Sequence, residues 1–324
     1  MKLSVLMKSA VVAASVGSLA GLALSSSFAS ALCFNPTTQN TIANNSDGSC
    51  PAGYFVATSN TMNGTMPPGA PTSFTIPPGY DLSKISGSDF PGLDPSMFSS
   101  FKPSDVKSFQ PSALTTMLSS QLGNIDPKSF ASFSPSQFAA MAPTAMAGMT
   151  PEQMKSLGAS VMVSFTADQM KNLDVSAIAA MSATQLGKLK SSAFAGITPE
   201  QIDGFTKKAI AAFNPSQFTK LDPSALAELD PSKITALATK VISALKDNQV
   251  AAMTPSQFAA FTVNQLKSLK PAIADSVTPD QIDALTVKEV KALSSSFRKA
   301  VLKDFTAEEE SELTSKILKA LKTK

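Results

Sequence analysis

The sequence predicts an all-α solenoid of short stacked helices, built from an 8/16-residue repeat that runs from residue 82 to residue 297. Three observations support this fold class. Apolar residues recur in two slots of every eight, helix-start tetrads stand between many of these apolar pairs, and glutamine recurs every sixteen residues. A β-solenoid is the alternative fold, since fixed-period repetition is typical of both kinds of stacked array.

The repeat is clearest when the chain is written in lines of eight from Leu82. Slots one and four are apolar in about 27 consecutive octads, without insertion or deletion. Such repetition is the signature of a solenoid, in which each unit buries its apolar face against its neighbours. The stretch 197–221 illustrates the expected repeat core, which consists of Ile197, Ile202, Phe205, Ile210, Phe213, Phe218 and Leu221.

Helix-start signals favour helices over strands. Thr, Ser, Asp or Asn can cap a helix, Pro suits the first helical position, and Gln three residues after the cap completes a capping box. Two tetrads match on all counts, and they supply the expected cap residues Thr150, Pro151, Gln153, Thr198, Pro199 and Gln201. Apolar spacings of three and four share one helical face, whereas a half-buried strand has a period of two.

A second period of sixteen divides the octads into two kinds. Slot eight is Gln in most alternate octads, as at Gln201 and Gln217, and small or apolar in the others, as at Ala209. We expect the glutamines to point outward or to form a polar cap, and the small side chains to point inward. Slot three is mostly Ala, Ser or Gly, which predicts close approach of neighbouring backbones.

Proline limits the length of each helix, because it costs about 3 kcal/mol or more in a helix interior. About half of the octads carry Pro in slot six. Where Pro is missing, we expect two octads to fuse into one continuous helix, as over 198–213 and 230–253. The predicted helices are therefore mostly two to four turns long.

The N-terminal region has a different composition. Residues 1–31 contain Lys2 and Lys8, then a small and apolar run that ends at Ala31, which predicts a cleaved signal peptide. An uncleaved membrane anchor is the alternative. Residues 32–81 are rich in Pro, Ser, Thr and Gly, and we expect a loop segment held by a disulfide between Cys33 and Cys50. An intermolecular bridge is the other possible pairing.

The C-terminal segment 298–324 is expected to form one amphipathic capping helix. Thr306 can cap it, acids follow in the first turn and lysines lie in the last turn, as the helix dipole favours. A repeat array needs such a terminal cap with a polar outer face. A docking helix for a partner or a membrane is the alternative.

No catalytic, cofactor-binding or metal-ligating residue is predicted. The chain has no histidine and only two cysteines, so His-dependent catalysis and His metal ligation have no candidates. The net charge is +3 without a basic run, so no nucleic-acid partner is expected. No small-molecule substrate is evident, and membrane contact is expected only through the targeting segment.

These observations predict a secreted, non-enzymatic structural repeat protein. The Thr-Pro-Glu-Gln tetrads resemble, in a general way, tandem arrays in large secreted and surface proteins, and this resemblance implies no particular activity. We expect a solenoid spacer, or a filament or matrix subunit, on the extracellular or periplasmic side of the cell surface. Its partners would be further copies of the chain or other surface or matrix proteins. The alternative is an extracellular protein-binding module for adhesion or scaffolding.

Overall fold

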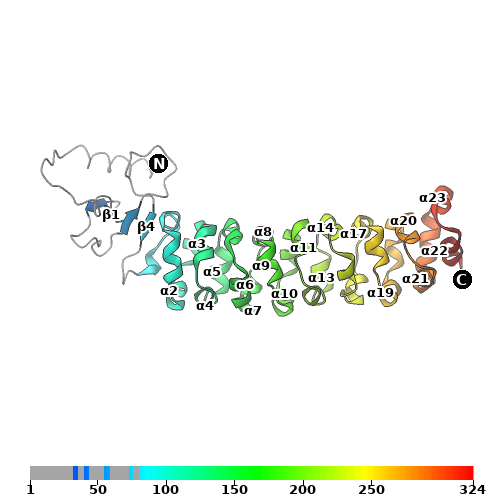
Figure 1. The fold of residues 1–324 in the computed structure, drawn as a ribbon, viewed down its shortest axis with the longest axis horizontal. Coiled ribbons are helices and arrows are strands. Elements are labelled where there is room, and N and C mark those ends of the chain that lie inside the picture. Colours follow the sequence, from blue (N-terminus) through cyan, green and yellow to red (C-terminus); the bar gives the residue numbers. More distant parts are fainter. Residues whose placement is uncertain (1–31, 36–39, 44–54, 59–72, 76–80, 324) are drawn as a thin grey trace. The chain divides into compact units, whose positions relative to one another are not determined.

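The structure is a computed structural model that describes residues 32–35, 40–43, 55–58, 73–75 and 81–323. The chain divides into two compact units (Figure 1). Unit 1 comprises Met1–Phe133 with Ala140–Ala145, and unit 2 comprises Ser134–Ala139 with Met146–Lys324.

Four short strands lie within the segment that we expected to consist of loops. They are β1 (Leu32–Asn35), β2 (Asn40–Ala43), β3 (Phe55–Thr58) and β4 (Ser73–Thr75). All pairs are antiparallel, in the order β2-β1-β3-β4, and Cys33 lies opposite Ile42 in β2 and Val56 in β3. Each strand has only three or four residues, so none produced a detectable alternation in the sequence.

The rest of the described chain is a succession of short helices. The 3₁₀ helices are η1 (Leu82–Lys84), η2 (Phe90–Gly92), η3 (Pro95–Ser100), η4 (Pro111–Thr116), η5 (Pro143–Gly148), η6 (Ser191–Gly196) and η7 (Pro271–Ser276). The first α-helices are α2 (Pro103–Ser108), α3 (Ser119–Asn124), α4 (Pro127–Phe130), α5 (Pro135–Ala140), α6 (Pro151–Ser156), α7 (Ala159–Met162), α8 (Ala167–Lys171), α9 (Val175–Ala179), α10 (Ala183–Lys188), α11 (Pro199–Ile202) and α12 (Lys207–Ile210). They are followed by α13 (Pro215–Phe218), α14 (Pro223–Ala227), α15 (Pro231–Ile234), α16 (Thr239–Ile242), α17 (Asp247–Ala252), α18 (Pro255–Ala259), α19 (Val263–Ser268), α20 (Pro279–Asp283), α21 (Val287–Ala292), α22 (Ser295–Asp304), α23 (Ala307–Glu312) and α24 (Ser315–Lys322).

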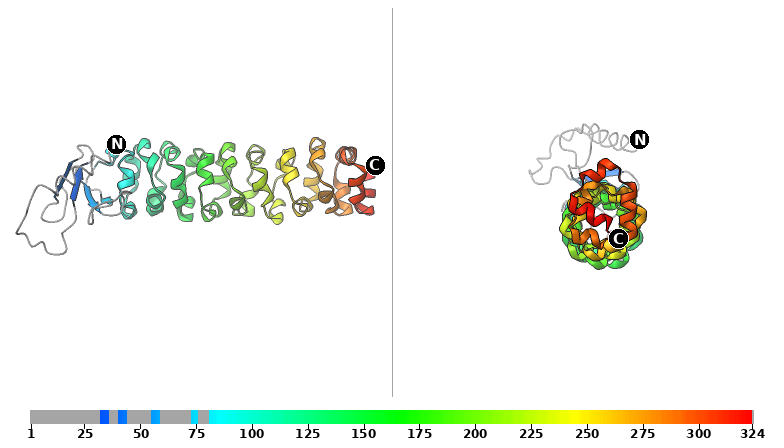
Figure 2. Two further views of the ribbon diagram at one scale, coloured as in Figure 1. Left: turned by 90° about the horizontal axis from the view of Figure 1, so that it is seen from above. Right: turned by 90° about the vertical axis from the view of Figure 1, so that its right-hand side faces the viewer.

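The prediction of an all-α solenoid is confirmed for the repeat, and the β-solenoid alternative is wrong. Each octad supplies one short helix, formed from slots six to eight and the first slots of the next octad. Every residue in slots one and four from Leu82 to Leu293 is buried. In the end-on view of Figure 2, the helices of unit 2 surround a common axis. Hydrogen bonds between its layers join residues 27 to 31 positions apart, so between three and four octads complete one turn.

The predicted fusion of neighbouring octads is wrong. Residues 198–213 form two separate helices, α11 and α12, because Thr206 adopts an extended conformation with φ −69° and ψ 155°. Its side chain accepts a hydrogen bond from the Ala209 N–H and starts α12 without a proline. Residues 230–253 likewise form α15, α16 and α17. The chain must bend after each octad to keep slots one and four facing the core, so the bend occurs without proline.

The C-terminal segment also differs from the expected single helix. It contains the end of α22, then α23 and α24, with Leu313 and Thr314 separating the last two. Arg298 occupies an apolar slot of the repeat and is only 7% exposed. Its Nη1 donates to the carbonyl oxygens of Ala320, at 3.1 Å, and Thr323, at 2.6 Å, where the dipole of α24 favours a cation.

Other predictions lie wholly or partly outside the described residues. These are the signal peptide over 1–31 and one half of the Cys33–Cys50 pair, namely Cys50. The described residues include no disulfide.

Candidate functional site

The helix-start tetrads form hydrogen-bonded caps in the structure. Oε1 of Gln153 accepts from the Thr150 N–H at 2.9 Å, and Oγ1 of Thr150 accepts from the Gln153 N–H at 3.2 Å. Oε1 of Gln201 accepts from the Thr198 N–H at 3.0 Å. Pro151 and Pro199 occupy the first helical positions. These bonds satisfy N–H groups that a helix start leaves without an intrahelical partner.

The glutamines in slot eight are buried, contrary to the expectation that they point outward. Their side chains are at most 5% exposed, and we name the set the glutamine ladder. Its members are Gln121, Gln137, Gln153, Gln169, Gln185, Gln201, Gln217, Gln249, Gln257, Gln265 and Gln281. The alternative expectation, a polar cap, is correct for the Oε1 atom of the amide, which accepts from the N–H of the cap residue.

The Nε2 end of the amide joins one layer of the solenoid to the next. Nε2 of Gln217 donates to the carbonyl oxygens of Leu186, at 3.0 Å, and Leu189, at 2.9 Å. These two acceptors lie 31 and 28 residues earlier in the chain, at the C-terminal end of α10. The Leu186 carbonyl also accepts from the Leu189 N–H at 3.1 Å, whereas the Leu189 carbonyl, just past the helix end, depends on the glutamine for a buried partner.

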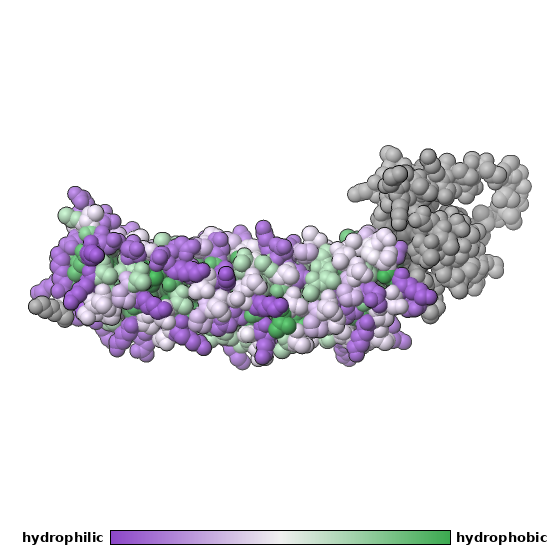
Figure 3. Space-filling view, turned by 180° about the vertical axis from the view of Figure 1, so that it is seen from behind, coloured by the Kyte–Doolittle hydropathy of each residue, from purple (hydrophilic) through white to green (hydrophobic). Residues whose placement is uncertain are grey.

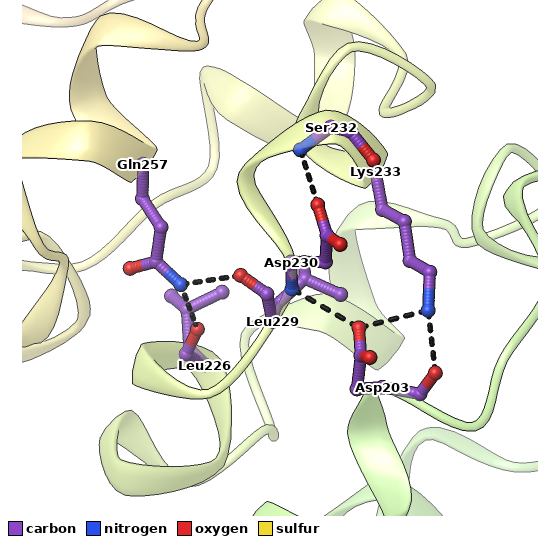
Figure 4. A network of polar contacts seen from close by, with 7 residues as sticks. All are labelled: Asp203, Leu226, Leu229, Asp230, Ser232, Lys233 and Gln257. Carbon is purple, nitrogen blue, oxygen red and sulfur yellow. Dashed lines mark hydrogen bonds and ion pairs between the residues drawn. The ribbon is translucent and has the colours of Figure 1, made fainter.

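One position of the series carries lysine in place of glutamine. Lys233 Nζ lies 2.5 Å from the carbonyl oxygen of Asp203 and 2.8 Å from its Oδ1 (Figure 4). Lysine has no acceptor, so it leaves the N–H of its own cap residue, Asp230, without the Oε1 partner. The carboxylate of Asp203 replaces that partner and accepts from the Asp230 N–H at 3.1 Å. In the same view, Gln257 makes the standard amide bonds to Leu226 and Leu229.

All seven residues of the expected repeat core are at most 3% exposed. Phe213 illustrates how they pack, because its ring meets those of Phe194 and Phe205 edge to face, with centroids 5.2 and 5.7 Å apart. Such aromatic pairs contribute about 0.5–1.5 kcal/mol beyond their area burial.

Aspartate caps with serine two residues later form a second kind of helix start. Hydrogen bonds from the side chain and the N–H of Ser224 lower the pKa of Asp222. The equivalent bonds from Ser176 and Ser232 lower the pKa of Asp174 and of Asp230. In each case the folded chain favours the charged carboxylate, because that form accepts both bonds.

Neither family models nor curated proteins match this sequence. Within the described part of the chain, no group of three or more acidic, His or Cys side chains could hold a metal ion. Among those residues, too, no helix has the length and apolar character needed to cross a bilayer.

Sequence reasoning missed the donor role of the ladder and the role of Arg298. The sixteen-residue return of glutamine beside an apolar slot marked these positions as special, but the carbonyls that each amide meets depend on which octads stack. Arg298 had a detectable signal, because it is a cation in an otherwise apolar slot. Its Nε is the one buried side-chain nitrogen or oxygen without a partner among the described residues.

Proposed function

We propose that the chain is a secreted, non-enzymatic structural repeat protein. Its octad array would act as a solenoid spacer, or as a subunit of a filament or matrix at the cell surface. The observation that carries this proposal is the use of both ends of the ladder amides. Gln217, for example, accepts from the Asn214 N–H at 3.1 Å and donates to two carbonyls of the previous layer.

The repeating positions are thus used to hold layers together. Slots one and four form the core, and slot eight links each layer to the previous one. In such an array each repeat contacts only its neighbours, and its length follows from the number of repeats. A spacer needs this property, because its dimension can change without any change in the local fold.

A deletion that preserves the octad register tests the proposal. Removal of Thr198–Leu245 takes out six octads and joins slot four of Ile197 to slot five of Lys246. Removal of Thr198–Val241 is the matched control, because it is four residues shorter and breaks the register. Both variants are made in the full chain.

A spacer predicts that the in-register deletion keeps the helical circular dichroism signal and a cooperative melt. At about 9 Å per packed helix layer, its maximum dimension in small-angle X-ray scattering should fall by roughly 15 Å. The control deletion should lose helical signal. Equal loss of structure in both variants, or an unchanged maximum dimension in the in-register variant, would contradict the proposal.

A further inference from the structure

In unit 2, helices from successive turns of the solenoid stack into columns, and exposed acids and lysines gather on different columns. The helices α8, α11, α14, α17, α20 and α23 stack on one side, and their labels follow one edge of the array in Figure 1. Element contacts join α11 to α14, α14 to α17 and α20 to α23, while ladder bonds join α8 to α11 and α17 to α20. This column carries the acidic stripe, which consists of the exposed residues Asp168, Glu200, Asp222, Glu228, Asp247, Asp280, Glu308 and Glu312.

A second column carries the opposite charge. It contains α10, α13, α16, α19, α21 and α24, joined by contacts from α13 to α24 and by ladder bonds from α13 to α10. Its lysine stripe consists of the exposed residues Lys188, Lys220, Lys240, Lys267, Lys288, Lys291, Lys316 and Lys319.

Few countercharges interrupt either stripe. Along the acidic column the cations are Lys171 and Lys246, and Nζ of Lys246 is bonded to a backbone carbonyl. The acid of the lysine column is Glu289, whose carboxylate caps its own helix. The helix dipole explains an acid near a helix start and a lysine near a helix end. It does not explain why the acids and the lysines occupy different columns.

From α8 to α19 the two stripes lie on opposite sides of the solenoid, whereas near the C-terminus α21 follows α20, and α24 follows α23, with helix starts only eight residues apart. The helix α8 begins at Ala167 and α10 begins at Ala183, sixteen residues later, and the same offset separates α14 at Pro223 from α16 at Thr239. Sixteen residues are about half of the 28 to 31 residues that separate bonded layers. In Figure 1, α10, α13 and α19 accordingly follow the edge opposite to α8, α11, α14 and α17.

Most of these charges have no ionic partner within the fold. In unit 2, Lys233 pairs with Asp203 and Lys322 pairs with Glu310, and neither pair includes a member of a stripe. The face in Figure 3 mixes hydrophilic and hydrophobic residues. The large apolar side chains that are exposed among the described residues are Leu118, Val163, Val175 and Val287.

We propose that the acidic stripe of one molecule binds the lysine stripe of a second copy of this chain, so that solenoids associate side by side. The inference rests on the proposed structural function and gives it a lateral interface. Charge complementarity selects the partner, because both stripes repeat with the layer spacing of the same solenoid. A second copy therefore presents lysines at the spacing of the acids. Since the stripes occupy opposite sides from α8 to α19, the contact is heterologous and leaves a free stripe on each outer molecule, which allows open-ended growth.

Charge reversal in full-length protein tests the proposal by sedimentation velocity and light scattering at low salt. The lysine variant is Lys240→Glu with Lys267→Glu, and the acidic variant is Glu228→Lys with Asp247→Lys. Each should weaken self-association about tenfold or more, because like charges would then face each other. A mixture of the two variants should regain association, since one offers only acidic stripes and the other only lysine stripes. Wild-type association should weaken as salt screens the charges.

The matched control is Lys190→Glu with Lys270→Glu, which changes the net charge by the same amount at exposed positions before η6 and η7, two helices outside both columns. This control should associate like the wild type. A wild-type chain that stays monomeric at low salt would overturn the inference, while the deletion test of the spacer would stand independently. Association sensitive to the lysine variant but not to the acidic variant would also overturn it, and would assign the lysine stripe to a polyanion instead.

Discussion

Replacement of Gln265 by methionine should destabilise the chain through lost hydrogen bonds alone. The side chain is 2% exposed. Its Oε1 accepts from the Thr262 N–H at 2.8 Å, and its Nε2 donates to the carbonyl oxygens of Ile234 and Leu237, each at 2.8 Å. Methionine has a similar length and flexibility, so the packing changes little.

The magnitude follows from the groups that lose partners. The Ile234 carbonyl keeps its bond from the Leu237 N–H at 3.0 Å, whereas the Leu237 carbonyl loses its bond to the ladder amide. A net hydrogen bond contributes about 0.5–1.5 kcal/mol, and a buried carbonyl left without a partner costs about 1–3 kcal/mol. We therefore expect the free energy of unfolding to fall by about 2–4 kcal/mol.

Urea unfolding followed by circular dichroism measures this change in free energy. An equal slope m in both variants shows that the same surface area is exposed on unfolding. The control is Asn264→Ala, an exposed neighbour that should change stability by less than about 0.5 kcal/mol. A rescue is available, since Gln265→Lys with Thr235→Asp copies the Lys233–Asp203 pair at the same separation of 30 residues. A loss below about 0.5 kcal/mol for the methionine variant would refute a stabilising role for the ladder.

Further predictions concern glycine, lysine and aspartate positions. A Cβ on Gly196 would lie 1.8 Å from a backbone oxygen of α8, so Gly196→Ala should lower the melting temperature, whereas Gly187→Ala, with open space around it, should raise stability by about 0.5–1 kcal/mol. Equal effects of these two changes in thermal melts would show that the close approach does not matter. Lys233→Gln should leave urea stability within about 1 kcal/mol of wild type, because the amide can replace both the ion pair and the cap bond, and a larger loss would contradict this exchange. Hydrogen bonds lower the folded pKa of Asp222 and Asp230, so their contribution is present above the unfolded pKa, near 3.8, and is lost as pH falls through the folded value. Melts between pH 7 and pH 2 should show less pH dependence after replacement of both aspartates by asparagine, and an unchanged dependence would rule out these caps as its source.

The sequence was sufficient for the repeat and for the kind of secondary structure within it. Apolar slots such as Phe205 and Phe213 and capping tetrads such as Thr150–Gln153 are local signals, and local signals decide where each helix begins. The helix ends were harder to predict. Residues 198–213 have good helical spacing throughout, but packing into the core requires a bend at Thr206 that helix propensity does not predict.

Features that depend on the number of octads per turn of the solenoid could not be predicted from the sequence alone. The donor role of Gln217 and the sorting of charges into two stripes both require knowledge of which octads stack. The sequence gives the period along the chain but not the rotation between octads. The pairing of Lys233 with Asp203 was hidden for the same reason, since 30 residues separate the two.

The short span of the ladder bonds has a consequence for synthesis on the ribosome. Each Nε2 bond closes a segment of 28 to 31 residues, whatever its position in unit 2. The entropy lost in closing such a segment is therefore the same for each added layer and does not grow with the length of the array. A nascent chain can dock each new octad as soon as it emerges, without waiting for distant segments, and proteins rich in such near-neighbour contacts fold quickly.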